Sequence, residues 1–315
     1  MTGPPRFPLA VLPTPLVPAP RLATGSPVLI KRDDLTGFGT TGNKARAMEF
    51  LLGAALRDGC DVLVAGGSSG SNFLQAVALA AACGGLGCEL VIAGEQDSAN
   101  LRIACGAGAQ LHPLGHGDRA QLDDAVRRLS DELAAAGRRP YPMPRGGSTP
   151  TGAIGFATAA GELHRQLAER DADPRLVVIA VGSGGSCAGL LAGASDWPAH
   201  RRILGVSVSR PLCEITPILH RLATACADEL GLPQPDMGRL ELLDAIGPGF
   251  GLPERADLVA ASTALTAEGL LLDDTYTAKS MAALLARAGS ARSRLGAPAV
   301  YWHTGGLASA IGRTR

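Results

Sequence analysis

A single lysine, Lys44, has the surroundings that chemistry on a carbonyl group requires. It follows a turn with three glycines within residues 37–42, and the apolar residues Met48, Leu51 and Leu52 then repeat at helical spacing. Lys44 is therefore predicted at the N-terminus of a helix, where the helix dipole and partial burial both disfavour a cation. Such a lysine tends toward the neutral amine, the form that condenses with carbonyl compounds. A solvated lysine at the start of a helix is the alternative.

A second segment has the composition of an anion site. Gly182, Ser183, Gly184, Gly185 and Ser186 lie between a β-branched run and a predicted helix. Glycines let backbone N–H groups converge on an anion, and the N-terminus of the following helix adds its dipole. The segment is neither a Walker loop nor a GxGxxG fingerprint, because no GK[ST] follows and the third glycine is replaced by cysteine. It predicts a phosphate site, with a tight packing turn as the alternative.

A third segment, GGSSGSNF at residues 66–73, follows another short apolar run. Ser71 and Asn72 are predicted to start a helix with free N–H groups and a side-chain cap. The cap alone is a sufficient reason for both residues.

Taken together, the chain resembles the pyridoxal 5'-phosphate (PLP) enzymes that include D-cysteine desulfhydrase and 1-aminocyclopropane-1-carboxylate (ACC) deaminase. KRDDLTG at residues 31–37 and GNKARAMEF at residues 42–50 carry the resemblance, and further segments match in the same order along nearly the whole chain. The resemblance implies that Lys44 forms a Schiff base with PLP and that residues 182–186 bind the cofactor's phosphate.

The same resemblance implies roles for five more residues. Asn72 would hydrogen-bond the phenolic oxygen of the cofactor, and Ser71 would face the carboxylate and the reacting carbon of the substrate. Tyr276, in the segment LLDDTYTAKS, would lie near the substrate, with Thr277 near the ring nitrogen. Thr304, in the segment HTGG, would help to hold the pyridine end of the cofactor.

Two positions of the substrate pocket depart from the family pattern, and a third position distinguishes the chain from the ACC deaminases alone. Phe73 stands where the family has histidine, and Phe250 stands where it has tyrosine. Neither side chain can donate a hydrogen bond or move a proton. Thr277 follows Tyr276 where the ACC deaminases have glutamate, which favours another reaction than ring opening. We therefore expect a larger or less polar substrate, whose leaving group needs no protonation.

The elements that must position these residues alternate along the chain. Short apolar runs predict strands at residues 28–31, 61–65, 89–93, 110–114, 176–181, 203–208 and 299–303. Helical spacing predicts helices from residue 45 and at residues 72–82, 100–107, 118–136, 152–170, 263–271 and 279–287. Residues 1–27 are rich in proline and predict an extended arm that crosses the surface.

Strands separated by helices predict an α/β protein with two parallel twisted sheets flanked by helices, and a cleft between two lobes. The resemblance implies the tryptophan-synthase-β-like PLP fold (fold type II). We expect a small lobe at residues 45–160 and a large, discontinuous PLP-binding lobe at residues 1–44 and 161–315.

Composition narrows the function classes. Lys+Arg and Asp+Glu are balanced at 29 each, which gives no electrostatic reason to expect nucleic acid or an anionic membrane as a partner. No apolar run approaches the roughly 20 residues of a membrane span, and the N-terminus lacks the apolar core of a signal peptide. The seven cysteines are scattered without metal-ligand spacing, so we expect no metal site and reduced thiols in the cytoplasm.

The resemblance implies a PLP-dependent lyase that removes the α-proton of a small amino acid and eliminates its β-substituent, and we expect a homodimer. Two alternatives stay open. The chain could be a β-replacement synthase, in which a nucleophile captures the same intermediate, or a PLP-binding protein with little turnover.

Overall fold

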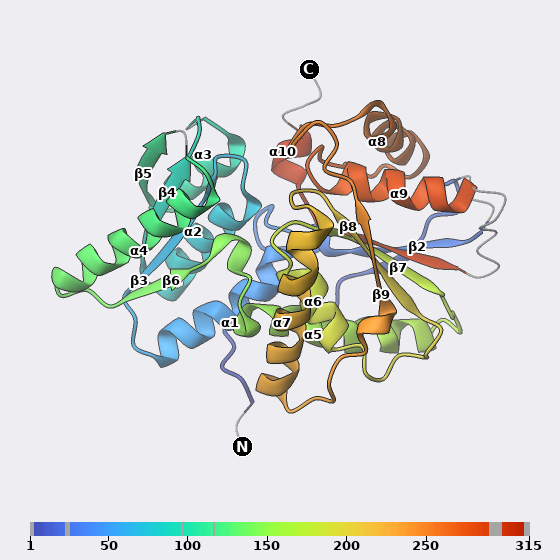
Figure 1. The fold of residues 1–315 in the computed structure, drawn as a ribbon, viewed down its shortest axis with the longest axis horizontal. Helices are drawn as coiled ribbons and strands as arrows, with labels where there is room; N and C mark the ends of the chain where they lie inside the picture. The colour runs from blue at the N-terminus through green and yellow to red at the C-terminus, as the bar shows by residue number, and fades with distance from the viewer. Residues whose placement is uncertain (1–2, 23–25, 96, 116, 290–297, 312–315) are drawn as a thin grey trace.

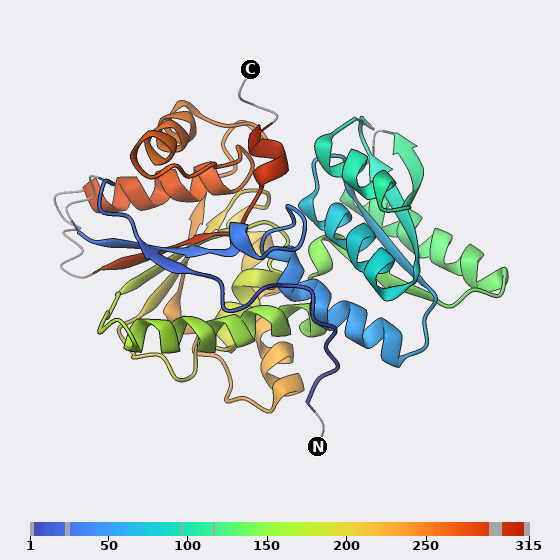
Figure 2. The same cartoon turned by 180° about the vertical axis from the view of Figure 1, so that it is seen from behind.

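The computed structural model contains two α/β lobes, each built around its own sheet (Figures 1 and 2). It describes residues 3–22, 26–95, 97–115, 117–289 and 298–311. Within these residues the smaller lobe has a four-stranded sheet in the order β5-β4-β3-β6, and the larger lobe has a six-stranded sheet in the order β1-β2-β10-β7-β8-β9. The predicted α/β class with two sheets flanked by helices is confirmed.

The small lobe has four parallel strands, β3 (Val62–Ser68), β4 (Gly87–Ala93), β5 (Gln110–Gly115) and β6 (Pro140–Met143). Its helices are α2 (Asn72–Gly84), α3 (Ala99–Gly106) and α4 (Arg119–Ala135). Side chains alternate across the sheet because the period of a strand is two. Leu63 and Ala65 pack in the core formed with α2 and α3, whereas Val64 packs against Leu122 of α4. The sheet is therefore covered on both faces.

The large lobe has six strands, β1 (Leu16–Pro18), β2 (Val28–Arg32), β7 (Leu176–Val181), β8 (Arg202–Ser207), β9 (Leu240–Asp244) and β10 (Ala299–His303). All neighbouring strands run parallel except β1 and β2, which pair antiparallel at one edge. A parallel pair needs a crossover of about a dozen residues, and the segment between β1 and β2 is shorter than that. The expectation of parallel strands fails only at this edge.

Helices cover both faces of the large sheet, as the two views show. They are α5 (Pro150–Ala168), α6 (Gly185–Ala192) and α7 (Leu212–Leu230) on one face, and α8 (Arg255–Glu268) and α9 (Thr277–Gly289) on the other. Along β7, Val177 and Ile179 pack toward the first group and Leu176 and Val178 toward the second. A short α10 (Leu307–Ile311) follows β10.

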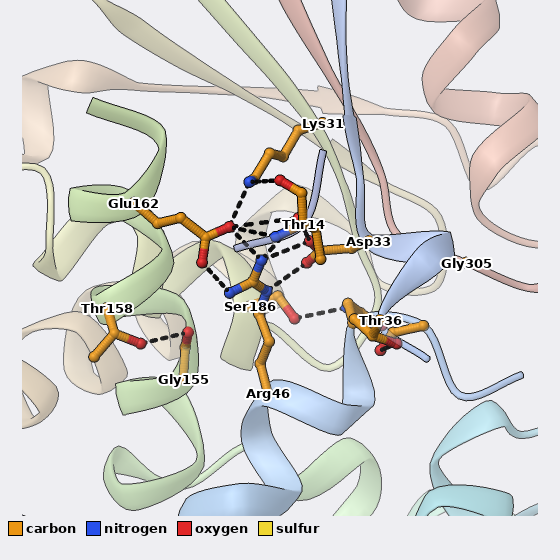
Figure 3. Close-up of polar contacts among 12 residues, drawn as sticks. Thr14, Lys31, Asp33, Thr36, Arg46, Gly155, Thr158, Glu162, Ser186 and Gly305 are labelled. Carbon is orange, nitrogen blue, oxygen red and sulfur yellow. Dashed lines mark hydrogen bonds and ion pairs between the residues drawn. The ribbon is translucent and has the colours of Figure 1, made fainter. Parts of the chain in front are cut away.

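Helix α1 (Lys44–Arg57) joins the two lobes. Met48 and Leu51 pack in the core of the small lobe. The opposite side carries Arg46, whose guanidinium pairs with Asp33 of the short helix η1 (Asp33–Leu35) and with Glu162 of α5 (Figure 3). We call Thr14, Lys31, Asp33, Arg46 and Glu162 the buried ionic network.

The backbones of α1, α5 and α6 approach one another closely. A Cβ added to Gly155 of α5 would collide with the carbonyl group of Arg46, and one added to Gly189 of α6 would collide with the carbonyl oxygen of Ala153. Gly193 meets the carbonyl oxygen of Ala157 in the same way. Only glycine permits such contacts, so these three positions fix the spacing of the helices.

Three sequence-based expectations need correction or comment. The N-terminal arm does not simply cross the surface, because Thr14 and Leu16 are buried and β1 joins the large sheet. The helix predicted at residues 263–271 instead spans α8, since Gly269 adopts the left-handed conformation that ends it. The proposed lobe boundary at residue 160 falls inside α5, whose apolar side chains belong to the core of the large lobe. This packing favours a boundary before α5.

Helix α7 was not predicted, because Pro217 lies inside it and proline removes a backbone donor. Two short 3₁₀ helices, η2 (Arg145–Gly147) and η3 (Met237–Arg239), complete the described elements. No helix in the described part of the chain is long and apolar enough to cross a membrane.

Candidate active site

A cavity of about 320 Å³ lies where the carboxyl ends of the strands of both sheets meet. Ser71 follows β3, the glycine loop follows β7 and Thr304 follows β10. The carboxyl edge of a parallel sheet is where such folds bind ligands, because the strand ends present loops and helix N-termini to one point. The cavity therefore lies where the topology predicts a site.

The structure brings all but one of the residues singled out in the sequence to this cavity. Those that line it are Lys44, Ser71, Asn72, Phe73, Gly182, Ser183, Gly184, Gly185, Ser186, Phe250, Tyr276 and Thr304. Thr277 is fully buried behind the wall instead, where its hydroxyl hydrogen-bonds with Asp273. The carboxylate of Asp273, which the sequence reasoning did not select, lines the cavity in its place.

Lys44 is the first residue of α1, as predicted. The chain has three lysines, and the other two are bonded elsewhere. The Nζ of Lys31 pairs with Glu162, and the Nζ of Lys279 donates to the carbonyl oxygens of Ala245 (2.9 Å) and Ile246 (2.7 Å). The Nζ of Lys44 makes no hydrogen bond or ion pair with the described residues, and burial lowers its pKa to about 8. Its amine is therefore the free lysine nitrogen of the site.

The residue before Lys44 ties the start of α1 to the opposite wall. The side-chain amide of Asn43 donates to the hydroxyl of Ser186 (2.9 Å), and its backbone N–H donates to the carbonyl oxygen of Thr304 (2.9 Å). These two bonds fix the helix start against both the glycine loop and the segment after β10. Asn43 was not singled out in the sequence, although it lies next to Lys44.

The glycine loop leaves its backbone open to the cavity. Gly184 has φ of 103°, a conformation that disfavours other residues, and it precedes α6. The backbone N–H of Gly185 donates to the hydroxyl of Ser148 (3.1 Å), which in turn donates to the hydroxyl of Ser183 (2.7 Å). The first turn of a helix leaves N–H groups without intrahelical partners. This arrangement fits a bound phosphate group.

Ser71 and Asn72 start α2, but the predicted side-chain cap is wrong, since the Ser71 side chain makes no cap hydrogen bond. The side-chain oxygen of Asn72 accepts a hydrogen bond from the amide nitrogen of Asn100 (3.2 Å). Asn100 also donates to the carbonyl oxygen of Gly70 (2.9 Å). Because this contact uses the oxygen of Asn72, its NH₂ group is left to serve as a donor toward the cavity.

Tyr276 forms part of the cavity wall next to the glycine loop. A Cβ on Gly182 would lie 2.9 Å from its ring, so glycine is required there. The ring meets Phe250 edge to face, with 6.0 Å between centroids. Its backbone N–H, like that of Thr277 (3.0 Å each), donates to the carboxylate of Asp273. Burial raises the pKa of the Tyr276 phenol, so this hydroxyl stays protonated and acts as a donor.

The two phenylalanines occupy different surroundings. Phe73 is 1% exposed and packs in the core of the small lobe beside Gly147, while its ring still touches the cavity. Phe250 is 48% exposed and lies at the mouth. Neither brings a polar group to the cavity.

Three arginines also line the cavity, and sequence reasoning missed them. They are Arg119 at the start of α4, Arg145 in η2 and Arg210 after β8. Arg119 and Arg210 each follow a predicted strand, and Arg145 lies in a glycine-rich loop. These positions were the signal in the sequence from which the three arginines could have been found. Within the described residues, no group of acidic, histidine and cysteine side chains could hold a metal ion.

The fold and the cavity define a PLP-dependent enzyme, with a free lysine facing a glycine loop at the meeting point of two sheets. The chain belongs to the pyridoxal-phosphate dependent enzyme family, whose model matches residues 8–305. It is 36% identical over 321 residues to D-cysteine desulfhydrase of Klebsiella pneumoniae (strain 342), covering 96% of this chain and 94% of that protein. The D-cysteine desulfhydrase of Salmonella choleraesuis (strain SC-B67) matches with the same identity and coverage.

Solved structures agree with this placement. A structure described as an ACC deaminase homologue has a TM-score of 0.90 and 33% identity, covering 97% of this chain and 93% of that chain. The threonine deaminase of T.th. has a TM-score of 0.68 at 23% identity, covering 93% of this chain and 92% of that chain, and shares the fold. The predicted family, fold type II and cofactor are confirmed.

The residues present fit PLP. Lys44 would hold the cofactor through Nζ, the glycine loop would bind its phosphate, and the NH₂ group of Asn72 would face its phenolic oxygen. When bound, PLP draws electron density away from the α-carbon of an amino acid. Asp273, one of the two aspartates that line the cavity, already accepts hydrogen bonds from the backbone N–H groups of Thr275, Tyr276 and Thr277, and burial raises its pKa.

Proposed function

We propose that this PLP-dependent lyase removes the α-proton of a small amino acid and eliminates its β-substituent, with pyruvate and ammonia as the products. The observation that carries the proposal is the free Lys44 amine, with its pKa of about 8, in the same cavity as the glycine loop. An amine with that pKa is partly neutral at pH 7, so it is able to accept a proton.

Three polar side chains that line the cavity have a part in this proposal. Lys44 Nζ would accept the proton of the α-carbon, because it is the free amine that lines the cavity. The hydroxyl of Ser71, which is free of a helix cap, binds the substrate carboxylate. The protonated hydroxyl of Tyr276, which lines the cavity, would face the β-substituent of the substrate.

The departures from the family pattern at Phe73 and Phe250 narrow the range of substrates that we propose. Phe73 and Phe250 bring no donor to the pocket, so two groups that could protonate a leaving group are missing. Positioned acid–base groups contribute about 10²–10⁴-fold each. We propose that D-cysteine and ACC are slow substrates and that the preferred leaving group departs without a proton.

The lysine assignment is tested by reducing the purified protein with borohydride in the presence of PLP. Peptide mapping should then find the cofactor on Lys44, while Lys31 and Lys279 stay unmodified because both are buried and bonded. A protein that binds no PLP, or that carries it on another lysine, would overturn the proposal.

The reaction is tested by screening D- and L-amino acids for release of pyruvate and ammonia. Tyr276→Phe should slow the best substrate about 10²-fold, and more than any other conservative change outside Lys44. Turnover only in the presence of an added thiol or amine would identify a β-replacement synthase instead. PLP binding without turnover of any substrate would identify a binding protein.

We further propose that the enzyme is a cytoplasmic homodimer. Four apolar side chains are about half exposed on α8 and the segment before it, namely Leu252 (54%), Leu258 (48%), Val259 (56%) and Leu265 (43%). Exposed apolar groups of this size are typical of interfaces. Sedimentation of the wild type and of Leu258→Glu tests the state, and a monomeric wild type would refute it.

A further inference from the structure

Three arginines converge on the active-site cavity from separate segments of the chain. Arg119 comes from the small lobe, whereas Arg210 follows β8 of the large lobe and Arg145 lies next to Gly146 of η2. Gly146 itself packs on the hydroxyl of Ser183, so Arg145 lies beside the glycine loop. The proposed elimination leaves no part for these three guanidinium groups.

The contacts of Arg119 and Arg210 show how close together they lie. The Nη1 atoms of both are 3.5 Å from the same oxygen, Oε2 of Glu214. Arg119 also donates to the carbonyl oxygen of Ser209, whose hydroxyl donates to the carbonyl oxygen of Gly182 (3.1 Å). The two guanidinium groups therefore meet across the cleft, next to the start of the glycine loop.

The three arginines lie close enough together for their positive charges to affect one another. Burial lowers the pKa of Arg210, and the nearby Arg119 and Arg145 lower it further. The side chains of Arg210, Arg145 and Arg119 are 17%, 23% and 42% exposed, respectively. A group of like charges that is partly withdrawn from water favours the binding of an anion.

The nearby carboxylates do not compete strongly for these arginines. Asp118 and Asp273 line the cavity, but Asp118 caps α4 and Asp273 accepts backbone hydrogen bonds. Glu214 and Asp123, which do pair with the arginines, have 49% and 39% of their side chains exposed. The pairs with Glu214 are long, at 3.5 Å each, and such pairs contribute only about 0–1 kcal/mol, so a ligand anion is able to replace them. Arg145 donates two hydrogen bonds to Asp123 (3.0 and 2.9 Å), so it adds its positive charge to the cluster while it stays paired.

We propose that Arg119, Arg145 and Arg210, together the arginine cluster, bind an oxyanion carried on the β-carbon of the substrate. The substrate class is then a small amino acid with a sulfonate, sulfate or phosphate group on that carbon. This rests on the proposed β-elimination and names its substrate. Guanidinium groups suit such oxyanions because they donate paired hydrogen bonds.

The chemistry of this step balances without a further reactant. The α C–H bond breaks and its proton goes to Lys44. The bond from the β-carbon to the substituent breaks, and the substituent keeps the bonding pair, leaving as sulfite, sulfate or phosphate. Water then releases pyruvate and ammonia. Such oxyanions leave without protonation, which agrees with the apolar Phe73 and Phe250, and the expectation of a less polar substrate is revised.

The test compares anionic and uncharged substituents on the holoenzyme. Cysteate, O-sulfoserine and O-phosphoserine are assayed in both configurations beside cysteine, serine and β-chloroalanine. We expect at least one anionic substrate to exceed the uncharged amino acids of its configuration by tenfold or more in kcat/KM. Turnover of β-chloroalanine alone would overturn the arginine proposal and keep the elimination. No pyruvate from any substrate would refute the elimination itself.

Variants of the arginines test whether the arginine cluster causes the preference for anionic substrates. Arg119→Gln and Arg210→Gln should each lower kcat/KM for the anionic substrate about 10–100-fold, the usual effect of one hydrogen bond to a charged group. Their kcat/KM for β-chloroalanine should change less than threefold. Arg221→Gln is the matched control, because Arg221 lines a neighbouring hollow with Arg145 and Arg210 but not the cavity. An equal loss in this control would contradict the proposal.

A binding measurement separates the substrate's oxyanion from the phosphate of the cofactor. 3-Phosphonopropionate lacks an amino group and cannot react, so its affinity for the holoenzyme is measured by calorimetry. It should bind about 10–100-fold more weakly to Arg119→Gln and Arg210→Gln, while both variants keep the visible absorbance of bound PLP. Loss of PLP from these variants would show that the arginines bind the cofactor's phosphate, and it would overturn the proposal.

Discussion

Lys44 and Arg46 lie two residues apart at the start of α1, and the protein treats their charges in opposite ways. Burial would lower the pKa of the Arg46 guanidinium, but Asp33 and Glu162 outweigh burial and raise it. For Lys44 nothing offsets burial, and its pKa falls to about 8. A helix turns about 100° per residue, so the two side chains face different surroundings. Pairing, rather than burial, therefore decides which cation becomes a reactive amine.

The buried ionic network has a structural role, which follows from the pairing of Arg46 (Figure 3). Arg46 is 1% exposed, and its guanidinium donates to Asp33 (2.8 Å), Glu162 (2.9 Å) and the hydroxyl of Thr14 (3.0 Å). The network ties α1 to β2 and α5, and so holds Lys44 in place without touching it. Arg46 should therefore contribute mainly to stability, and Lys44 mainly to the chemistry.

The largest effect is expected from Lys44→Ala. Activity should fall by at least about 10²–10⁴-fold, because the proton-accepting amine is lost, and the absorption band of lysine-bound PLP should vanish. The free energy of unfolding of the apoenzyme should stay at or above the wild-type value, since an unpaired amine has been removed from a buried position. An unfolded Lys44→Ala protein would contradict the division of roles.

Arg46→Met should do the opposite. Removing one partner of a buried ion pair costs about 3–5 kcal/mol, because the carboxylates that remain are uncompensated. Urea unfolding of the apoenzyme measures this loss. Arg57→Met is the control on the same helix, since its pair with Asp58 is exposed, and it should change stability by less than about 0.5 kcal/mol. Equal losses of unfolding free energy in both variants would contradict the stabilising role of Arg46.

Glu162 gives the network a dependence on pH. Burial would raise the pKa of this carboxyl, but Arg46 and Lys31 lower it from 4.5 to about 2. The resulting stabilisation of about 3 kcal/mol is present above pH 4.5 and is lost as the pH falls toward 2.

Glu162→Gln should therefore be less stable than wild type at pH 7, and the difference should shrink toward pH 2. Urea unfolding at several pH values measures both. Glu132→Gln, on the exposed side of α4, is the control and should show no such trend. A constant difference across the pH range would mean that the charge of Glu162 does not matter.

The smallest effect concerns the uptake of PLP by the apoenzyme. With a pKa of about 8, the neutral fraction of Lys44 rises from about one tenth at pH 7 to about nine tenths at pH 9. The rate of appearance of the lysine-bound PLP band should rise about tenfold over this range. An ordinary lysine would give a rise of about a hundredfold, which would show that burial does not lower this pKa.

Part of the fold was predictable because the central strands β7 and β10 are short and buried along their whole length. The bounds predicted for β7 and β10 match the structure, since an apolar run flanked by loop residues leaves little freedom in choosing its ends. Helix α7 was not predicted, because Pro217 interrupts its helical pattern of apolar residues. The antiparallel β1 was missed because the prolines on both sides of it favoured an extended arm on the surface.

The site was predictable where its residues stand together in the sequence. Lys44 and the glycine loop are each recognisable from their neighbours. The arginine cluster is not, since Arg119, Arg145 and Arg210 are scattered and only the meeting of strand ends brings them together. Thr277 was placed at the cofactor by its position in a matching segment, but helix α9 begins there and turns its hydroxyl toward Asp273.

The glycines between α1, α5 and α6 have a consequence for precision. Where two backbones touch, there are no side-chain rotamers to adjust, so the separation of the helices has a single value. Gly155 and Gly189 set this separation on the two sides of α5, between the helix that begins with Lys44 and the helix that follows the phosphate loop. The main chain alone therefore sets the distance between the Lys44 amine and the phosphate site. A single methyl group added at Gly155 or Gly189 would change that distance.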